Sequence, residues 1–520
     1  MRRAYQASKL ILPLLHGNYR RSSTLPPATD KRWAGIGKEI SDFARSCDTG
    51  KQAFEECKTA REQLECVIQS VGYDMNVFTF GGLVTLGLFE AGGDVDFVGI
   101  LDVEPELEEC GVIVSRVSRE LRRFGIKCRA LSRARVPVVK ADRVSRALPG
   151  SPLHTLSSEG IFQFSRQLEE NECFSLEKRL TEKFSALDIE WNSSHQLATV
   201  RFSSTAALVY ALTHLKSFGE VEIPLRVPVD PKHGPELFRF PFDFCLSSTG
   251  LRNSYVLRNA LLEYPYSRHL LLAIKKWGRE TGIVNPIDGF LASYALTIML
   301  VHFLAKSDVI SKVASSSTTV SPSMNAEYTP LMECASENDA NQVGFLFAKF
   351  LEYYAEVFDY KESVVCTSNV NLSKAAMGWN RQENTTGHPP FFEFCIKDPF
   401  GLDNVARNLD AFSTAYVKEA HTHALKSITN NLNNPFSFDA FLQNALKPES
   451  ASRSLTERGI HSDFLTPDQF EARHVLHKME FSERKKSIEQ FGRRTVRNSK
   501  NQKFATNVTN SVLGWIKSDE

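Results

Sequence analysis

The segment Phe80-Gly-Gly-Leu-Val-Thr-Leu-Gly-Leu-Phe-Glu-Ala-Gly-Gly-Asp94-Val-Asp96-Phe97 decides the fold of this chain. Its pattern predicts a glycine-rich turn, a short helix, and a strand that carries two aspartates one residue apart. Side chains at positions i and i+2 of a strand point to the same face, so Asp94 and Asp96 can direct two carboxylates at one point. Two such charges repel each other unless a cation lies between them. Mg²⁺ prefers oxygen ligands and usually binds with substrate phosphates, so the segment predicts a metal site for nucleotide chemistry.

The composition indicates a globular protein of about two to four domains. The chain has 520 residues with 62 basic and 61 acidic side chains, so any affinity for nucleic acid must come from local patches. No apolar stretch reaches the length of a membrane span. The ten cysteines are scattered and form no C-x-x-C pair, which favours free thiols over a zinc module or a disulfide framework.

The N-terminal stretch contains no acidic residue before Asp30. Basic residues alternate there with apolar ones and precede a short Ser/Thr run; they are Arg2, Arg3, Lys9, Arg20 and Arg21. This composition is typical of a mitochondrial transit peptide, so it predicts such a peptide over residues 1–30 and a location in the mitochondrial matrix. A disordered basic tail is the alternative.

Residues 145–235 predict a separate module. Strand and helix patterns alternate there in the order strand, helix, strand, strand, helix, strand, which is the ferredoxin-like order shared by RNA recognition motifs. In that module aromatic side chains on the sheet stack on bases. Phe164 and Phe202 are the nearest equivalents, with packing in the core as the alternative.

A third carboxylate lies beyond this module. The segment 238–246 predicts a strand that resumes the first domain, and it places Asp243 among phenylalanines. An unpaired carboxylate in such surroundings is costly, which favours a metal-binding role for Asp243. Helices are then predicted at 254–263, 266–279 and 291–304, a strand at 391–398, and another helix from about Val405.

Four further motifs follow in order: Gly250-Leu-Arg-Asn253-Ser254, Ile274-Lys275-Lys-Trp277-Gly-Arg279, Gly289-Phe-Leu-Ala-Ser293-Tyr294, and Ile396-Lys-Asp398-Pro399-Phe400. With the three aspartates, they give residues 35–420 a resemblance to the noncanonical poly(A) polymerases and terminal uridylyltransferases of the DNA polymerase β-type nucleotidyltransferase superfamily. The inserted module is similar to that of the mitochondrial enzymes of kinetoplastids, which are the RNA-editing uridylyltransferases and the kinetoplast poly(A) polymerase.

The resemblance implies an α+β fold with three parts. These are a polymerase β-type nucleotidyltransferase catalytic domain, an inserted ferredoxin-like (RRM-like) middle domain, and a mainly helical poly(A) polymerase-associated domain that recognises the base. The expected bounds are 35–145 with 236–270, 146–235, and 271–445, respectively. A basic extension at 446–520 follows, as a solvated tail or a contact to the RNA backbone.

The resemblance also implies template-independent transfer of nucleotides from an NTP to an RNA 3′ end, with Mg²⁺ or Mn²⁺ held by Asp94, Asp96 and Asp243. Lys275 and Arg279 would grip the triphosphate, Ser293 would donate to a phosphate, and Tyr294 would stack on the base. The full nucleotide-binding set is Gly81, Gly82, Asn253, Ser254, Lys275, Arg279, Ser293, Tyr294 and Asp398. Asn253 and Ser254 match a ribose-contacting pair, and Arg135 and Arg407 would contact RNA or brace the domains. ATP or UTP, the RNA, and accessory RNA-binding proteins of a mitochondrial RNA-processing complex are the expected partners.

Two departures from the family pattern bear on activity and base choice. Gly82 stands where the family has a serine that reaches a phosphate, although backbone N–H groups of a glycine turn can still bind phosphate. The motif Asp398-Pro-Phe-Gly401 keeps the first of two acids that read uracil and lacks the second. A site without that polar partner loses discrimination, which favours ATP and hence a mitochondrial poly(A) polymerase. A terminal uridylyltransferase is the first alternative, and a weakly active RNA-binding subunit is the second.

Overall fold

The computed structural model describes residues 32–141, 158–226, 240–312, 326–380, 392–430 and 435–457, apart from single positions and short gaps within these ranges. The predicted transit peptide at 1–30, Arg135 and nearly all of the basic C-terminal extension lie outside the described residues. Among the described helices, none is long and apolar enough to cross a membrane.

A five-stranded sheet carries the segment quoted above. Its strands stand in the order β1-β2-β11-β4-β3. They are β1 (Asn76–Phe80), β2 (Val95–Ile100), β3 (Arg129–Leu131), β4 (Val138–Ala141) and β11 (Phe242–Cys245). The short helix α4 (Gly81–Leu86) links the antiparallel pair β1 and β2. β11 lies parallel to β2 and antiparallel to β4, so a strand far along the chain completes the middle of the sheet.

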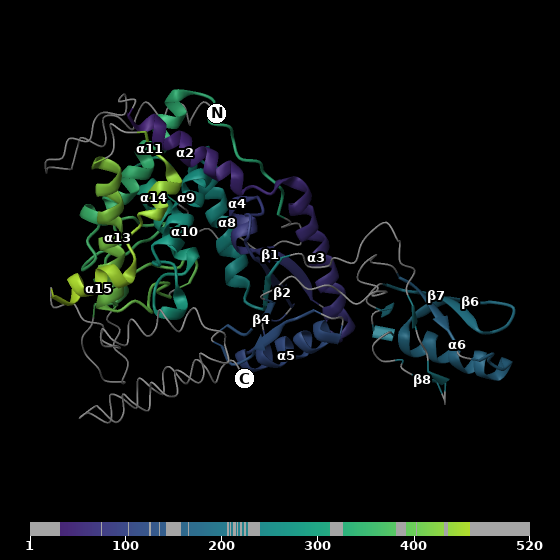
Figure 1. The fold of residues 1–520 in the computed structure, drawn as a ribbon. Coiled ribbons are helices and arrows are strands. Elements are labelled where there is room, and N and C mark those ends of the chain that lie inside the picture. The colour runs from purple at the N-terminus through teal and green to yellow at the C-terminus, as the bar shows by residue number, and fades with distance from the viewer. Residues whose placement is uncertain are drawn as a thin grey trace.

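The two faces of this sheet have different roles. Helices α3 (Gly50–Ser70) and α5 (Leu107–Arg123) share one apolar core with Phe97, Phe244 and Val139 of one face, as Figure 1 shows in outline. The other face packs Phe78 and Val98 against Leu251 of the following helix. Because side chains alternate along a strand, Asp96 and Asp243 fall on this second face, away from the main core.

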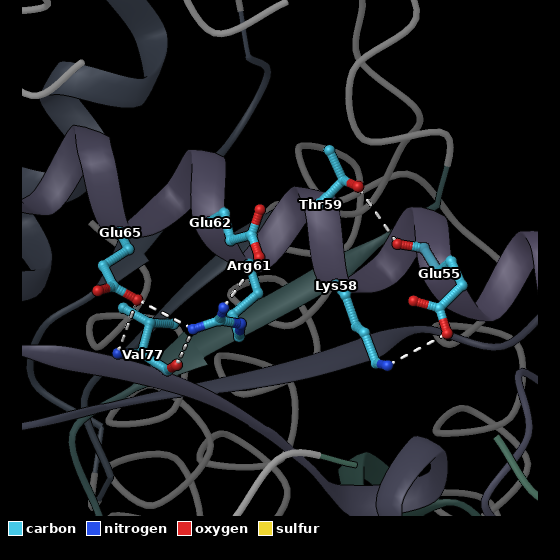
Figure 2. A network of polar contacts seen from close by, with 7 residues as sticks. All are labelled: Glu55, Lys58, Thr59, Arg61, Glu62, Glu65 and Val77. Carbon is cyan, nitrogen blue, oxygen red and sulfur yellow. Dashed lines mark hydrogen bonds and ion pairs between the residues drawn. The ribbon is translucent and has the colours of Figure 1, made fainter. Parts of the chain in front are cut away.

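Polar side chains of α3 cover the free edge of β1. The Arg61 guanidinium donates to the Val77 carbonyl oxygen at 3.0 Å, and the Val77 N–H donates to the Glu65 carboxylate at 3.4 Å (Figure 2). Arg61 also pairs with Glu65 at 3.1 Å and with Glu62 at 3.2 Å. An exposed strand edge invites pairing with another chain, and these contacts occupy the backbone groups of Val77 on that edge.

The inserted module forms a second sheet, in the order β10-β5-β7-β6, which stands apart from the rest in Figure 1. Its elements are β5 (Glu159–Gln163), α6 (Glu170–Phe184), β6 (Ala186–Trp191), β7 (Leu197–Phe202) and β10 (Leu225–Arg226), with a small pair β8 (Ser217–Phe218) and β9 (Val221–Glu222) before the last strand. All neighbours are antiparallel, and the last strand lies beside the first, which is the ferredoxin-like order.

Phe164 and Phe202 both lie in the core of this module, 5% and 1% exposed. Phe164 stacks on Trp191 with ring centroids 5.6 Å apart. The core alternative is therefore confirmed for both rings, and stacking of these two on bases is wrong, since neither offers a free face.

The remaining elements are mainly helical, and most of them share one large core. They are α2 (Arg32–Cys47), α8 (Ser248–Leu262), α9 (Ser267–Glu280), η2 (Pro286–Asp288), α10 (Ser293–Lys306), α11 (Glu337–Glu352) with its π-helical continuation η3 (Tyr353–Val357), α12 (Lys374–Met377), α13 (Ala411–Asn430), α14 (Phe438–Gln443) and α15 (Pro448–Glu457).

Two predictions near residue 400 are wrong. The expected strand at 391–398 forms only isolated bridges, from Ile396 to Val365 and from Lys397 to Asn404. The buried Asn404 amide binds backbone groups of residues 394, 396 and 406, so a compact loop replaces a strand. The helix expected from Val405 begins at Ala411, where the Asp410 carboxylate accepts the Ser413 N–H at 2.7 Å and caps the first turn.

Helices α2 and α11 cross at very short range through two glycines, and Figure 1 shows them side by side. A Cβ atom on Gly344 would overlap the Trp33 carbonyl oxygen and lie 2.8 Å from the Gly37 nitrogen.

Gly344→Ala should therefore lower the free energy of unfolding by about 1–3 kcal/mol, the usual cost of overpacking. Gly35→Ala on the same helix is the matched control, because nothing lies within 4 Å of its Cβ position. That variant should gain about 0.5–1 kcal/mol from helix propensity. Urea unfolding measures both, and equal effects of the two substitutions would refute the close crossing.

Candidate active site

The three predicted aspartates meet at one point of the catalytic sheet. Asp96 of β2 and Asp243 of β11 lie directly opposite each other in the parallel pair, and Asp94 immediately precedes β2. One carboxylate oxygen from each of the three lies within 4.8 Å of the others. Three carboxylates at this separation form a donor set that fits a hard divalent cation.

Asp96 carries the electrostatic strain of the cluster. Burial raises its pKa to about 8, and the neighbouring charges of Asp94 and Asp243 push it in the same direction. Lys140 and Lys275 oppose the shift. Near neutral pH, Asp96 therefore binds a proton unless a cation lies beside the three carboxylates. This is a second reason why the cluster fits a metal ion.

Lys140 is a site residue that the sequence did not reveal. It lies on β4 opposite Asp243, and its Nζ atom is 2.9 Å from Asp243 Oδ2. The side chains of Lys140 and Asp243 are 34% and 25% exposed, so the pair remains reachable from solvent. Pairing with Lys140 offsets the cost of placing the Asp243 carboxylate beside Phe242 and Phe244.

The glycine turn fits closely around Asp96. Gly81 has a φ of +66°, a left-handed conformation that glycine adopts readily. Its N–H donates to the Ser254 hydroxyl at 2.8 Å, and that hydroxyl donates to the Gly250 carbonyl at 2.7 Å. Ser254 therefore holds the turn, and its contact with a ribose stays a prediction. Next to it, Gly82 has space, because a Cβ atom there would meet only Lys275 Nζ, at 3.8 Å.

Glu90 holds the two cations that are predicted to bind triphosphate. Arg279 of α9 contacts Glu90 at 2.6 Å, and Lys275, one turn earlier, lies 3.9 Å from it. Lys275 is buried, and burial lowers its pKa while Glu90, Asp96 and Asp94 favour its charged form. The sequence contained a signal for Glu90, since it is the only charged residue between Phe80 and Gly93.

Asp398, the expected base-recognition acid, is engaged by the protein through both oxygens. Asn253 Nδ2 of α8 donates to Oδ2 at 2.8 Å, and the Tyr294 hydroxyl of α10 donates to the same atom at 3.3 Å. The backbone N–H groups of Phe400 and Gly401 donate to Oδ1 at 3.0 and 2.7 Å. The structure thus brings Asn253, Tyr294 and Asp398 into one cluster.

The surroundings of two other predicted residues, Ser293 and Arg407, do not by themselves assign a role to either side chain. The Ser293 hydroxyl, at the start of α10, is buried without a hydrogen-bond partner among the described residues, as expected of a group that awaits a ligand. Arg407 lies 4.0 Å from Asp403, with a third of its side chain exposed. Its contact with RNA or with another domain stays a prediction.

Known sequences are similar to this chain over different parts of its length. Residues 342–404 match the family model described as Cid1 family poly A polymerase. Terminal uridylyltransferase 1 of Trypanosoma brucei brucei is 26% identical over 75% of this chain and 44% of its own length. Poly(A) RNA polymerase GLD2 of Danio rerio is 27% identical over 44% of this chain and 46% of its own length. The chain thus spans less than half of each of these two relatives.

Comparison with solved structures shows which fold the chain has. The superposition on the RNA editing TUTase 1 from Trypanosoma brucei in complex with UTP covers 83% of this chain and 92% of the TUTase chain, with a TM-score of 0.61 and 23% sequence identity. Terminal uridylyl transferase 4 from the same organism, with bound UTP and UMP, has a TM-score of 0.51 and 18% identity. At these identities the likeness is one of fold, and it confirms the expected fold class. Residues 342–404 therefore match the Cid1 family poly A polymerase model, the chain has the fold of the solved terminal uridylyltransferases, and its relatives include kinetoplastid terminal uridylyltransferases and the GLD2 and cid13 poly(A) polymerases.

Proposed function

We propose that this chain adds nucleotides from an NTP to the 3′ end of RNA without a template. The observation that supports this most directly is the group of three carboxylates within 4.8 Å, with the buried Lys275 ammonium close by. Carboxylates that can hold metal ions, beside cations that can hold a triphosphate, are the requirements of nucleotidyl transfer, which asks the protein for positioning and charge neutralisation.

Each part of the site has a role in this proposal. Asp94, Asp96 and Asp243 would hold Mg²⁺ or Mn²⁺, which supplies charge neutralisation at the reacting phosphate and lowers the pKa of the RNA 3′-hydroxyl. Lys275 and Arg279 leave Glu90 to contact the triphosphate, because a phosphate offers them more negative charge than one carboxylate. The Gly82 N–H, one residue after the Gly81 N–H that binds Ser254, and the Ser293 hydroxyl would complete the phosphate contacts.

We propose ATP as the preferred nucleotide. The N3–H of uracil needs an acceptor, and both Asp398 oxygens already accept two hydrogen bonds each. Gly401 supplies no second acid. Because hydrogen bonds then contribute less to recognition of the base, stacking of the base on Tyr294 contributes relatively more. Stacking favours the larger purine ring of ATP over the pyrimidine ring of UTP. UTP is the second candidate, which the names of the uridylyltransferase relatives favour.

The cellular setting is proposed from the sequence alone. The basic, acid-free N-terminus supports a location in the mitochondrial matrix. Phe164 and Phe202, the two candidate base-stacking rings of the inserted module, are buried and cannot bind RNA themselves. Transfer to RNA in that compartment would therefore take place with accessory RNA-binding proteins of an RNA-processing complex.

The test is extension of one labelled RNA with Mg²⁺ and each of the four NTPs in separate reactions. We expect kcat/KM for ATP to exceed that for UTP by about tenfold, the discrimination that one lost polar contact can explain. An Asp243→Asn protein, purified in the same way, controls for contaminating polymerases. Preference for UTP would refute the choice of ATP, and absence of extension with every NTP would favour the RNA-binding subunit.

A further inference from the structure

Glu90 is a largely buried carboxylate in contact with both cations that are predicted to bind the triphosphate. Its Oε1 atom lies 2.6 Å from Arg279 Nη1, and its Oε2 atom lies 3.9 Å from Lys275 Nζ. The side chain of Glu90 is 14% exposed, that of Lys275 is 7% exposed, and that of Arg279 is 43% exposed. The contact therefore runs from a buried ammonium to a guanidinium that an incoming ligand can reach from solvent.

The backbone around Glu90 is fixed by hydrogen bonds. Glu90 forms an isolated bridge with Asp48, and its carbonyl oxygen accepts the Gly93 N–H at 2.9 Å. The Ala91 N–H donates to the Cys47 carbonyl oxygen at 2.8 Å. Because the carboxylate stands at the end of a flexible side chain, it can turn away from the cations by a change of rotamer while this backbone stays in place. Exchange of Glu90 for another anion therefore requires no movement of the loop that precedes β2.

A phosphate at the glycine turn would compete with Glu90 for the same cations. Lys275 Nζ lies 3.9 Å from Glu90 Oε2 and 3.8 Å from the position of a Cβ atom on Gly82. An anion that binds the Gly82 N–H and Lys275 would therefore lie beside the Glu90 carboxylate. Like charges so close repel each other, so either the phosphate or Glu90 holds Lys275.

Neutralising the two cations does not by itself require Glu90. The guanidinium of Arg279 is exposed enough to be hydrated without a partner. Lys275 already lies near Asp96 and Asp94, which favour its charged form together with Glu90. An ion pair that loses hydration on burial often adds nothing to stability. A role in ligand binding therefore accounts for a carboxylate at this position better than folding does.

We propose that Glu90 is an internal counter-anion of the triphosphate site, which binds Lys275 and Arg279 while the site is empty, yields them to the phosphates of an NTP, and takes them back as pyrophosphate leaves. This inference rests on the proposed function, because it takes the NTP and the pyrophosphate of that reaction as the ligands of the site. In the reaction the RNA 3′-oxygen releases its proton and bonds to the α-phosphorus. The bond from that phosphorus to the β-phosphate oxygen breaks, and its electron pair leaves with pyrophosphate. A carboxylate that competes for both cations lowers the affinity for NTP and for pyrophosphate, and it speeds release of the product.

The test measures binding of inorganic pyrophosphate with Mg²⁺ by isothermal titration calorimetry, without RNA or NTP. Glu90→Gln removes the competing charge and keeps the size of the side chain. The Kd for pyrophosphate should therefore fall about tenfold, the effect of one charged contact that no longer has to be broken. Glu90→Asp keeps the charge on a shorter side chain, so its Kd should lie between those of Glu90→Gln and the wild type.

Glu280→Gln is the matched control, since Glu280 pairs with Lys276 of the same helix at 2.8 Å. It should leave the Kd for pyrophosphate unchanged. If Glu90→Gln does not fold, Glu90→Asp replaces it, with a Kd about threefold below that of the wild type expected from a weakened ion pair.

Steady-state kinetics supply a second readout. In Glu90→Gln, the KM for NTP and the Ki of added pyrophosphate should both fall about tenfold, in line with the Kd. The kcat should also decrease, because pyrophosphate leaves more slowly. A role limited to holding Lys275 and Arg279 in place predicts the opposite sign, with weaker binding of both ligands.

The outcomes separate the two proposals. Unchanged or weaker binding of pyrophosphate by Glu90→Gln in an otherwise active enzyme overturns the inference alone. Tighter binding by Glu90→Gln, together with a wild-type protein that extends RNA with no NTP, refutes the proposed function and supports Glu90 as the counter-anion of a phosphate site. If neither protein binds pyrophosphate and the wild type is inactive, both proposals are wrong.

Discussion

Asp96→Asn should abolish nucleotide transfer and at the same time raise the thermal stability of the metal-free protein. Transfer is lost because a neutral amide cannot share a divalent cation with Asp94 and Asp243. Stability rises because the charged Asp96 carboxylate destabilises the folded protein: it is buried and lies beside two like charges, which raise its pKa to about 8. Removing that charge without changing the shape of the side chain relieves the repulsion, a recurrent exchange of activity for stability at active sites.

The pH dependence of stability follows from the same shift. Asp96 has a folded-state pKa of about 8, above its ordinary value of 3.8, so between these pH values the folded state holds a proton that the unfolded state has released. The free energy of unfolding of the wild-type protein therefore falls as pH rises through this window. Asp96→Asn lacks this contribution, so its Tm should exceed that of the wild type by a margin that widens from pH 5 to about pH 8 and then levels off.

Melting curves with and without Mg²⁺ check this prediction. Mg²⁺ should raise the Tm of the wild-type protein and have little effect on Asp96→Asn, so the margin between them narrows. Asp188→Asn is the control, because Asp188 is an exposed aspartate of the inserted sheet, 3.3 Å from Arg201. It should leave both transfer and Tm nearly unchanged. Full activity of Asp96→Asn would refute the metal assignment, and loss of activity without a gain in Tm would refute the electrostatic strain.

Local patterns were sufficient to predict the carboxylates and the order of the inserted module, whereas the catalytic fold was expected from the family resemblance. The i, i+2 spacing of Asp94 and Asp96 depends only on strand geometry, and a phenylalanine-rich strand placed Asp243 beside them. The alternation of strands and helices predicted the ferredoxin-like order in the same way. Such regularities are local, since they depend on residues that are neighbours in the sequence.

What escaped prediction depends on contacts between distant segments. Glu90 stands out in the sequence as a lone charge, but its partners Lys275 and Arg279 reach it only through α9. Lys140 joins the site only because β11 inserts beside β4. The segment 391–398 has the alternation of a strand, and the Asn404 side chain further along the chain takes over its backbone groups. A buried side chain that binds backbone leaves no periodic trace in a sequence.

Gly81→Ala should reduce transfer to near the background rate, although it adds a single methyl group. The residue has a φ of +66°, which an alanine adopts at a cost of about 1–2 kcal/mol. Its Cβ atom would also overlap the Asp96 carboxylate, so either that carboxylate or the turn must move. Movement of the turn would break the hydrogen bond of 2.8 Å between Gly81 N–H and Ser254, and movement of the carboxylate would open the three-aspartate cluster.

Gly82→Ser is the matched substitution, one residue later, and the expected result is opposite. Its Cβ atom would meet only Lys275 Nζ, at 3.8 Å, an ordinary contact distance. A hydroxyl beside a bound phosphate can donate a hydrogen bond to a charged acceptor, worth about 1.5–3 kcal/mol. Steady-state kinetics should therefore show a KM for NTP about tenfold lower, with kcat maintained, because the added contact binds substrate and transition state alike. Similar losses in both variants would mean that the turn tolerates no side chain at either position. The opposite responses expected here would show that geometry requires Gly81, while a serine at position 82 adds a phosphate contact that Gly82 lacks.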